Sequence, residues 1–215
     1  MAKLPSGIFG PISGKLGNLI GGIWKGIPYL KENKPRKLKL DRTPAQLANE
    51  EKFRFANNWL IPFHPFIGVG FLTQASQRTT ISAALSQVYN TVFTGTYPDL
   101  EIHADQMVIS VGKLTPVLNT QIVMTAPDTI SVTWEKNTQR GTKYNDQIMV
   151  VLYDSDQHIA DGFVGGVNRA TEQYTFKFND YLIGKTLHAY ISVTSINRTN
   201  ISNSQYLGTI NPFQL

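Results

Sequence analysis

The residues of this chain that could carry chemistry are few and scattered. The run Gly184-Lys185-Thr186 imitates the end of a phosphate-binding loop. Such a loop needs a glycine five residues earlier, where this chain has Asn179. The run also lies between two predicted strands, whereas a phosphate-binding loop leads into a helix. We therefore do not expect nucleotide binding at this position.

Neither the acidic residues nor the histidines form a metal-binding pattern. Asp154, Asp156 and Asp161 lie close together, but His158 and Ile159 occupy the positions where a calcium loop needs an oxygen ligand and a glycine. The remaining histidines have no zinc-ligand spacing. The chain has no cysteine, which excludes disulfides, thiolate metal sites and cysteine nucleophiles. We predict no catalytic residue, no metal and no cofactor, and therefore a protein that is not an enzyme.

Positive charge is concentrated in the first quarter of the chain. Residues 1–54 contain 11 lysines and arginines against 4 acidic residues, whereas the rest is slightly acidic, so the formal net charge of +5 comes from this segment. Such a concentration either contacts nucleic-acid phosphates or solvates a linker. The densest part is a basic run whose cations are Lys31, Lys34, Arg36, Lys37, Lys39 and Arg42.

Residues 1–42 form an apolar arm that is rich in glycine. It holds seven of the seventeen glycines. Some of them have the spacing of a glycine zipper, but a helix over residues 12–27 would carry five glycines at about 1 kcal/mol each. A kinked strand or a hairpin around Gly21–Gly22 is therefore favoured. In either form the arm must pack its large side chains on the body or on a neighbour, and these include Ile8, Phe9, Trp24, Ile27 and Tyr29.

Residues 43–98 are predicted to be helical. Thr43-Pro44-Ala45-Gln46 is a helix start, with threonine at the N-cap, proline at the first position and glutamine three residues after the cap. Phe55 and Trp59 share one face of this helix, which ends before Pro62. A second helix is expected over residues 80–93. The two helices would form an amphipathic hairpin that covers a sheet or a partner.

Residues 99–215 have the alternating pattern of β-strands. Alternation occurs at residues 130–134, 148–152, 174–178 and 187–193, and turn signals such as Asn145-Asp146 and Gly165-Gly166 separate these segments. Each strand has one face that can be buried. We predict an antiparallel β-sandwich, and hence an α+β chain that combines an arm, a helical region and a sandwich.

The sequences TISVTWEKN and EQYTFKFNDYLIGKTLHAYISVTSINRTNISNSQYLG resemble a fibronectin type III or related immunoglobulin-like domain. Trp134 stands where that fold has its core tryptophan, and Gly184 marks the corner between the fifth and sixth strands. Leu187 replaces the tyrosine that usually follows this corner. The resemblance covers residues 115–215 and implies a fold without implying a function.

A second resemblance covers most of the chain. The segments MAKLPSGIFGPISGKLGN, WKGIPYLK, TPAQLANEEKF and TGTYPDLEI are similar to a family of uncharacterised bacterial proteins from Bacteroidetes. That family is a domain of unknown function. The resemblance implies no activity and no functional residues.

The apolar arm on a neutral body favours a self-assembling structural subunit, such as a capsid, tube or filament protein of a phage-like or bacterial particle. We expect a homo-oligomer in which the arm contacts a neighbour, with nucleic acid as a further partner if the basic run faces a lumen. The alternative is a non-catalytic protein- or glycan-binding or adhesion module built on the sandwich. An enzyme or a membrane-active protein is a weaker third hypothesis.

The apolar stretches are too short to cross a membrane as a helix, which needs about 18 apolar residues in a row. Glycine and lysine interrupt the apolar N-terminal residues, so we expect no Sec signal peptide. We expect synthesis in the cytoplasm, followed in the assembly hypothesis by incorporation into a virion-like or extracellular particle.

Overall fold

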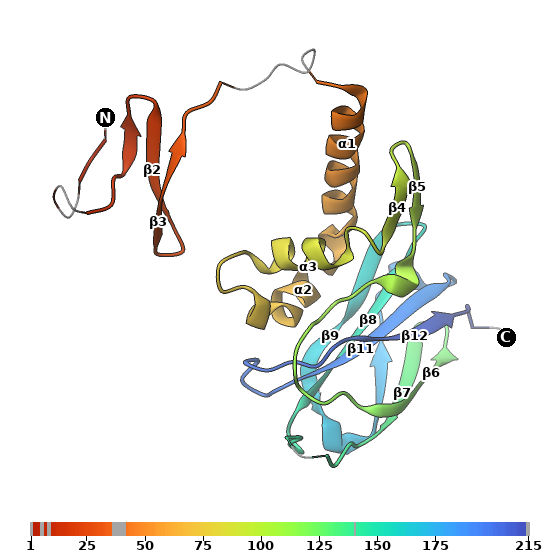
Figure 1. Cartoon of the computed structure of the whole chain (residues 1–215). Helices are drawn as coiled ribbons and strands as arrows, with labels where there is room; N and C mark the ends of the chain where they lie inside the picture. The colour runs from red at the N-terminus through yellow and green to blue at the C-terminus, as the bar shows by residue number, and fades with distance from the viewer. Residues whose placement is uncertain (1, 5–6, 8–9, 36–41, 140, 214–215) are drawn as a thin grey trace. The chain divides into compact units, whose positions relative to one another are not determined.

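Two compact units, Met1–Leu47 and Ala48–Leu215, make up the computed structural model of this chain (Figure 1). The structure describes residues 2–4, 7, 10–35, 42–139 and 141–213. Within these residues no helix is both long and apolar enough to cross a membrane.

The N-terminal unit contains an antiparallel three-stranded sheet. Its strands are β1 at Gly14–Leu16, β2 at Leu19–Trp24 and β3 at Ile27–Glu32, with β2 in the centre. Two-residue turns connect them. Lys25 and Gly26 have φ angles of 48° and 80°, the two positive values that a type I′ turn requires. Of the two predicted forms, a strand through Gly21–Gly22 or a hairpin that turns there, the strand is confirmed, because both glycines lie within β2 and the hairpin turn is at Lys25-Gly26.

Helix α1 spans Pro44–Trp59 and begins as the sequence predicts. The Thr43 hydroxyl accepts a hydrogen bond from the Gln46 backbone N–H at 3.3 Å, and the Gln46 side-chain oxygen accepts one from the Thr43 N–H at 3.2 Å. These reciprocal bonds form the expected capping box.

The chain after α1 forms two short helices, where the sequence analysis expected one. A 3-10 turn at Ile61–Phe63 leads into α2 at His64–Gly70, and α3 at Thr80–Val88 follows. The prediction of a helix to residue 93 is too long by five residues, because Phe93 already belongs to a strand. Helix α2 was not predicted, since its proline and its two glycines are typical of loops.

Two hairpin strands, β4 at Phe93–Thr96 and β5 at Asp99–Ile102, connect the helices to a seven-stranded β-sandwich. One sheet has the order β10-β7-β6 and the other β12-β11-β8-β9, with all pairs antiparallel. This arrangement confirms the predicted fibronectin type III-like sandwich. Its strands are β6 Leu118–Ala126, β7 Thr129–Glu135, β8 Gln147–Asp154, β9 Ile159–Asn168, β10 Gln173–Lys177, β11 Leu187–Thr194 and β12 Gln205–Ile210.

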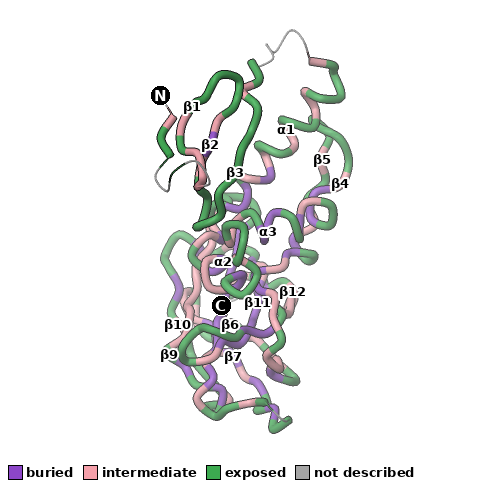
Figure 2. The backbone as a smooth tube through the Cα atoms, turned by 60° about the vertical axis from the view of Figure 1, so that its left-hand side comes forward, coloured by how far each residue is buried: buried purple, intermediate pink, exposed green. Residues whose placement is uncertain are grey.

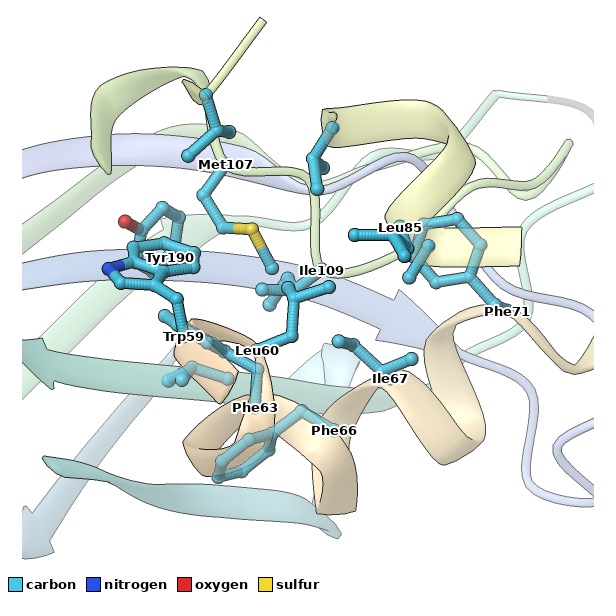
Figure 3. Close-up of a cluster of buried hydrophobic side chains, with 14 of the residues drawn as sticks. Trp59, Leu60, Phe63, Phe66, Ile67, Phe71, Leu85, Met107, Ile109 and Tyr190 are labelled. Carbon is cyan, nitrogen blue, oxygen red and sulfur yellow. The ribbon is translucent and has the colours of Figure 1, made fainter. Parts of the chain in front are cut away.

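The two central strands of the four-stranded sheet, β8 and β11, are buried on both faces. One face packs against β7 and Trp134 in the sandwich core. The other face carries Tyr153, whose ring contacts Trp59 and Phe63, and Tyr190, whose ring contacts Phe63. Figure 3 shows Trp59, Phe63 and Tyr190 in this cluster. The expectation of one buried face per strand is therefore wrong for β8 and β11, which are buried along most of their length because the helices cover their outer face.

Strand β9 contains Gly165 and Gly166, which the sequence analysis placed in a turn. Both have positive φ angles, 82° and 86°, and the register of β8 against β9 shifts beside them. The Gln147 side-chain oxygen accepts a hydrogen bond from the Gly166 N–H at 3.0 Å. The glycines therefore form a bulge within the strand, and the prediction of a turn is wrong.

Trp59 lies in the core that the helices share with the four-stranded sheet. Its ring packs edge-on against Phe93 and Tyr153 at centroid distances of 5.2 and 5.3 Å. We expect Trp59→Ala to lower the free energy of unfolding by about 3–5 kcal/mol. Phe53→Ala on the same helix is the control, because Phe53 is exposed and its loss should cost below about 1 kcal/mol. Urea denaturation measures both, and equal losses would contradict a core shared by helices and sheet.

Candidate functional site

The N-terminal sheet exposes large apolar side chains. Figure 2 shows the backbone of β3 in the colour of exposed residues. All six residues of β3 are exposed, and of the residues of β2 only Gly21 is buried. Soluble monomers rarely expose contiguous apolar patches of this kind unless the patch binds something. The exposed apolar residues of the three strands are Leu16, Leu19, Ile23, Trp24, Ile27, Tyr29 and Leu30.

The strand register divides these side chains between two faces. Residues directly opposite each other in neighbouring strands point to the same side of a sheet, and successive residues alternate. The Trp24 face consists of Lys15, Ile20, Gly22, Trp24, Ile27, Tyr29 and Lys31. The Leu30 face consists of Gly14, Leu16, Leu19, Gly21, Ile23, Pro28, Leu30 and Glu32.

Two adjacent glycines allow close packing, one on each face. A Cβ atom at Gly21 would collide with the backbone carbonyl of Ile12, because the chain before β1 crosses the Leu30 face there. A Cβ atom at Gly22 would lie 2.7 Å from the Tyr29 hydroxyl oxygen, because the Tyr29 ring lies across its cross-strand partner. Aromatic residues commonly cover glycines in sheets in this way.

The structure brings three of the five predicted assembly residues together. Trp24 and Ile27 are direct cross-strand partners, and Tyr29 lies two residues further along β3 on the same face. The three side chains therefore form one apolar surface, with Lys15 and Lys31 at its edge. Ile8 and Phe9 lie outside the described residues.

The Leu30 face was not predicted. Leu16, Leu19, Ile23 and Leu30 are about half exposed, as much as the residues that the sequence analysis selected. Lys25-Gly26 was the signal that could have found them, because a turn at these residues fixes the strand register and thereby the face of every side chain.

The six cations of the basic run are only partly described. Lys31 belongs to the Trp24 face, and the Lys34 ammonium lies 3.3 Å from the Glu32 carboxylate, with both side chains well exposed. Arg42 precedes α1. Arg36, Lys37 and Lys39 lie outside the described residues.

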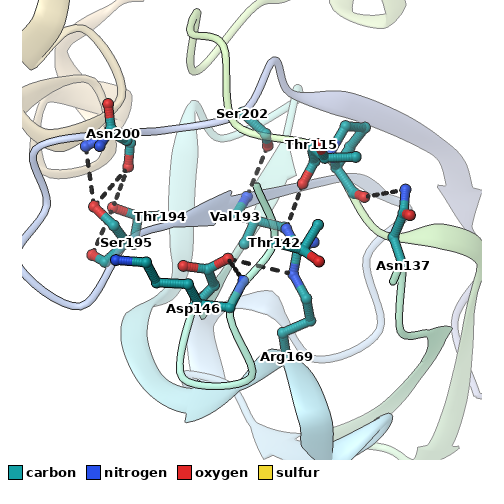
Figure 4. A network of polar contacts seen from close by, with 12 residues as sticks. Thr115, Asn137, Thr142, Asp146, Arg169, Val193, Thr194, Ser195, Asn200 and Ser202 are labelled. Atoms are coloured by element: carbon teal, nitrogen blue, oxygen red, sulfur yellow. Dashed lines mark hydrogen bonds and ion pairs between the residues drawn. The ribbon is translucent and has the colours of Figure 1, made fainter. Parts of the chain in front are cut away.

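The sandwich contains a second candidate site near Arg169, which is almost fully buried (Figure 4). Its guanidinium donates to the Thr115 carbonyl and lies 3.8 Å from the Asp146 carboxylate. Its backbone carbonyl accepts a hydrogen bond from the Trp134 indole at 2.8 Å. Burial lowers the pKa of Arg169 and the Asp146 charge opposes this effect. The ion pair ties the loop after β7 to the end of β9.

A pocket of about 230 Å³ adjoins this ion pair. Tyr144 at its edge is 78% exposed, beside hydroxyl and amide side chains that can donate and accept hydrogen bonds. Among the described residues no group of three histidine, aspartate or glutamate side chains is placed to hold a metal ion. The pocket is lined by Lys136, Asn137, Thr138, Thr142, Lys143, Tyr144, Arg169 and Ala170.

Comparison with known proteins gives a matching family model and a similar solved structure. A family model described as "Family of unknown function (DUF6266)" matches residues 11–208. The solution structure of the fn3 domain of the human collagen alpha-1(XX) chain is similar, with 12% sequence identity, a TM-score of 0.37 and coverage of 47% of this chain and 89% of that domain. No curated protein matches the chain.

A substitution at Gly21 tests whether the backbone at Ile12 packs closely on β2. We expect Gly21→Ala to disturb the packing of Ile12 on β2 at a cost of about 1–3 kcal/mol, because the new methyl group meets backbone atoms. Hydrogen exchange of the β2 and β3 amides should become roughly tenfold faster or more. Gly17→Asn is the control, since Gly17 has open space around it and asparagine tolerates its φ of 56°. Unchanged exchange in Gly21→Ala would contradict this packing.

Proposed function

We propose that this chain, which belongs to the family of unknown function DUF6266, is a non-catalytic structural subunit that self-associates through its N-terminal sheet. The observation that carries the proposal is the Trp24 face, where Trp24, Ile27 and Tyr29 are adjacent and each is 43–53% exposed.

Two properties of this surface favour a protein partner. Tryptophan and tyrosine are enriched among the residues that contribute most to protein interfaces, and here they lie at the centre of a patch with lysines at its edge. Burial of large apolar side chains is worth about 1.5–3 kcal/mol each when it is complete. Three such side chains on a preformed sheet supply the kind of centre from which stable interfaces are built.

A second copy of the chain is the partner that this proposal names. A contact that closes about a two-fold axis gives a dimer, whereas a contact that repeats without closing gives a tube or a filament. Either kind of contact agrees with the predicted class of self-assembling subunits. The sandwich and its helical layer then form the body that the N-terminal sheet links to its neighbours.

Trp24→Ala in the full-length chain tests this function. We expect self-association to weaken by at least about tenfold, because the largest side chain of the Trp24 face is removed. Light scattering over a range of protein concentrations measures the change in mass. Tyr181→Ala is the matched control, since Tyr181 is an exposed aromatic residue outside both candidate sites and should leave the mass unchanged. A wild-type chain that stays monomeric throughout, or a Trp24→Ala chain with wild-type behaviour, would refute the proposal.

The alternative function is a binding module, and the pocket beside Tyr144 is the observation that favours it. An exposed aromatic ring next to hydroxyl and amide groups suits a glycan or a polar peptide. Titration with neutral oligosaccharides, followed by the NMR signals of Thr142 and Tyr144, tests this function. We expect shifts that disappear in Tyr144→Ala and persist in Trp24→Ala. Absence of any shift in the wild-type chain would exclude neutral oligosaccharides as ligands of this pocket.

A further inference from the structure

We propose that two copies of the chain pair through β3, antiparallel about a two-fold axis at Leu30, so that two three-stranded sheets become one sheet. This inference rests on the proposed function and adds a second contact, made by the outer edge of the same sheet. Strand β3 is a suitable edge, because among the described residues it pairs only with β2 and all six of its residues are exposed. An unpaired strand edge is a template for another strand.

The turn before β3 determines which residues of β3 hydrogen-bond to β2 and which direct their backbone N–H and carbonyl groups outward. In a two-residue hairpin the residues that flank the turn exchange hydrogen bonds, and bonded pairs then recur at every second residue. Ile27, Tyr29 and Lys31 therefore bond to β2. The bond from the Asn33 N–H to the Asn18 carbonyl, at 2.8 Å, continues the same series. The backbone groups of Pro28, Leu30 and Glu32 point outward.

The outward groups are self-complementary about Leu30. With Leu30 opposite Leu30 of a second copy, each Leu30 N–H donates to the other Leu30 carbonyl. Each Glu32 N–H then faces the Pro28 carbonyl of the other copy. Proline has no N–H to donate in return, and the Glu32 carbonyl opposite it already accepts a hydrogen bond from the Lys34 N–H at 3.1 Å. The missing donor thus faces an acceptor that already has a partner.

Neighbouring registers are poorer. Centring the axis on Tyr29 would oppose Pro28 to Leu30, and each such pair would lack one donor. Centring it on Lys31 would place two lysine side chains directly opposite each other, and like charges in this position are destabilising. In the register centred on Leu30, Lys31 lies opposite Tyr29 of the second copy, and the lysine ammonium can form a cation–π interaction with the tyrosine ring.

This pairing also joins the apolar surfaces. A two-fold axis perpendicular to the sheet keeps both Trp24 faces on the same side. Trp24, Ile27 and Tyr29 of the two copies then lie on one face of the joined sheet, with Lys31 of each copy beside Tyr29 of the other at the junction.

Single cysteines test the register, because the chain has none of its own. Leu30→Cys places two sulfurs across the axis, where the Cα separation of a hydrogen-bonded antiparallel pair, about 5.5 Å, lies within the disulfide range. Ile23→Cys is the matched control. Ile23 and Leu30 are both 56% exposed and on the same face, but Ile23 belongs to the central strand. The full-length variants are oxidised at about 10 µM and the crosslinked dimer is measured on a non-reducing gel.

We expect Leu30→Cys to crosslink on the order of a hundred times faster than Ile23→Cys, because pairing raises its effective concentration to about the millimolar range. Equal rates would overturn the proposal, since random collision would explain them. If light scattering shows a wild-type oligomer while Leu30→Cys crosslinks no faster than the control, pairing through β3 is refuted and self-association stands. If the wild type is monomeric and neither variant crosslinks, both proposals fail.

Discussion

A β-sheet has two faces, and each apolar face must be covered by something. The larger unit meets this constraint within its own sequence. Its four-stranded sheet lies between the three-stranded sheet and the helices, so that Ile148, Val150 and Leu152 pack on one side while Met149, Val151 and Tyr153 pack on the other. Strand β8 is consequently a nearly continuous apolar segment. The helical layer and the sandwich are therefore one body, held together by strands that serve two cores.

The N-terminal sheet meets the same constraint only in part. About twenty residues build three strands, and the chain before β1 covers a limited area around Gly21. Trp24, Tyr29 and Leu30 remain about half exposed on two opposite faces. A sheet of this size cannot bury both faces with its own side chains. Its composition, with large apolar residues separated by glycines, is suited to a surface that another surface completes.

Local signals in the sequence predicted the elements that depend on local chemistry. The capping box at Thr43 and Gln46 and the alternation around Trp134 correspond to α1 and β7. The prediction failed where tertiary contacts decide the conformation. Phe66 and Ile67 hold α2 in place through burial although its proline and glycines suggest a loop. Gly21–Gly22 and Gly165–Gly166 are turn signals in isolation, yet the first pair allows close packing and the second forms a bulge. Of the candidate site, the residue types on the Trp24 face were predictable, whereas the Leu30 face needed the strand register.

The two edges of the N-terminal sheet differ in length. Strand β3 has six residues, while β1 has three and is preceded by a bridge in which Lys3 and Ser13 exchange backbone hydrogen bonds at 2.7 and 2.9 Å. When two sheets join through β3, the outermost strands of the product are the two short β1 strands. These offer little backbone for further addition, so lateral growth terminates after one round. The joined sheet therefore ends in edges that do not readily add further strands. A larger assembly must then form by contacts between sheet faces, which avoids the open-ended strand addition typical of amyloid.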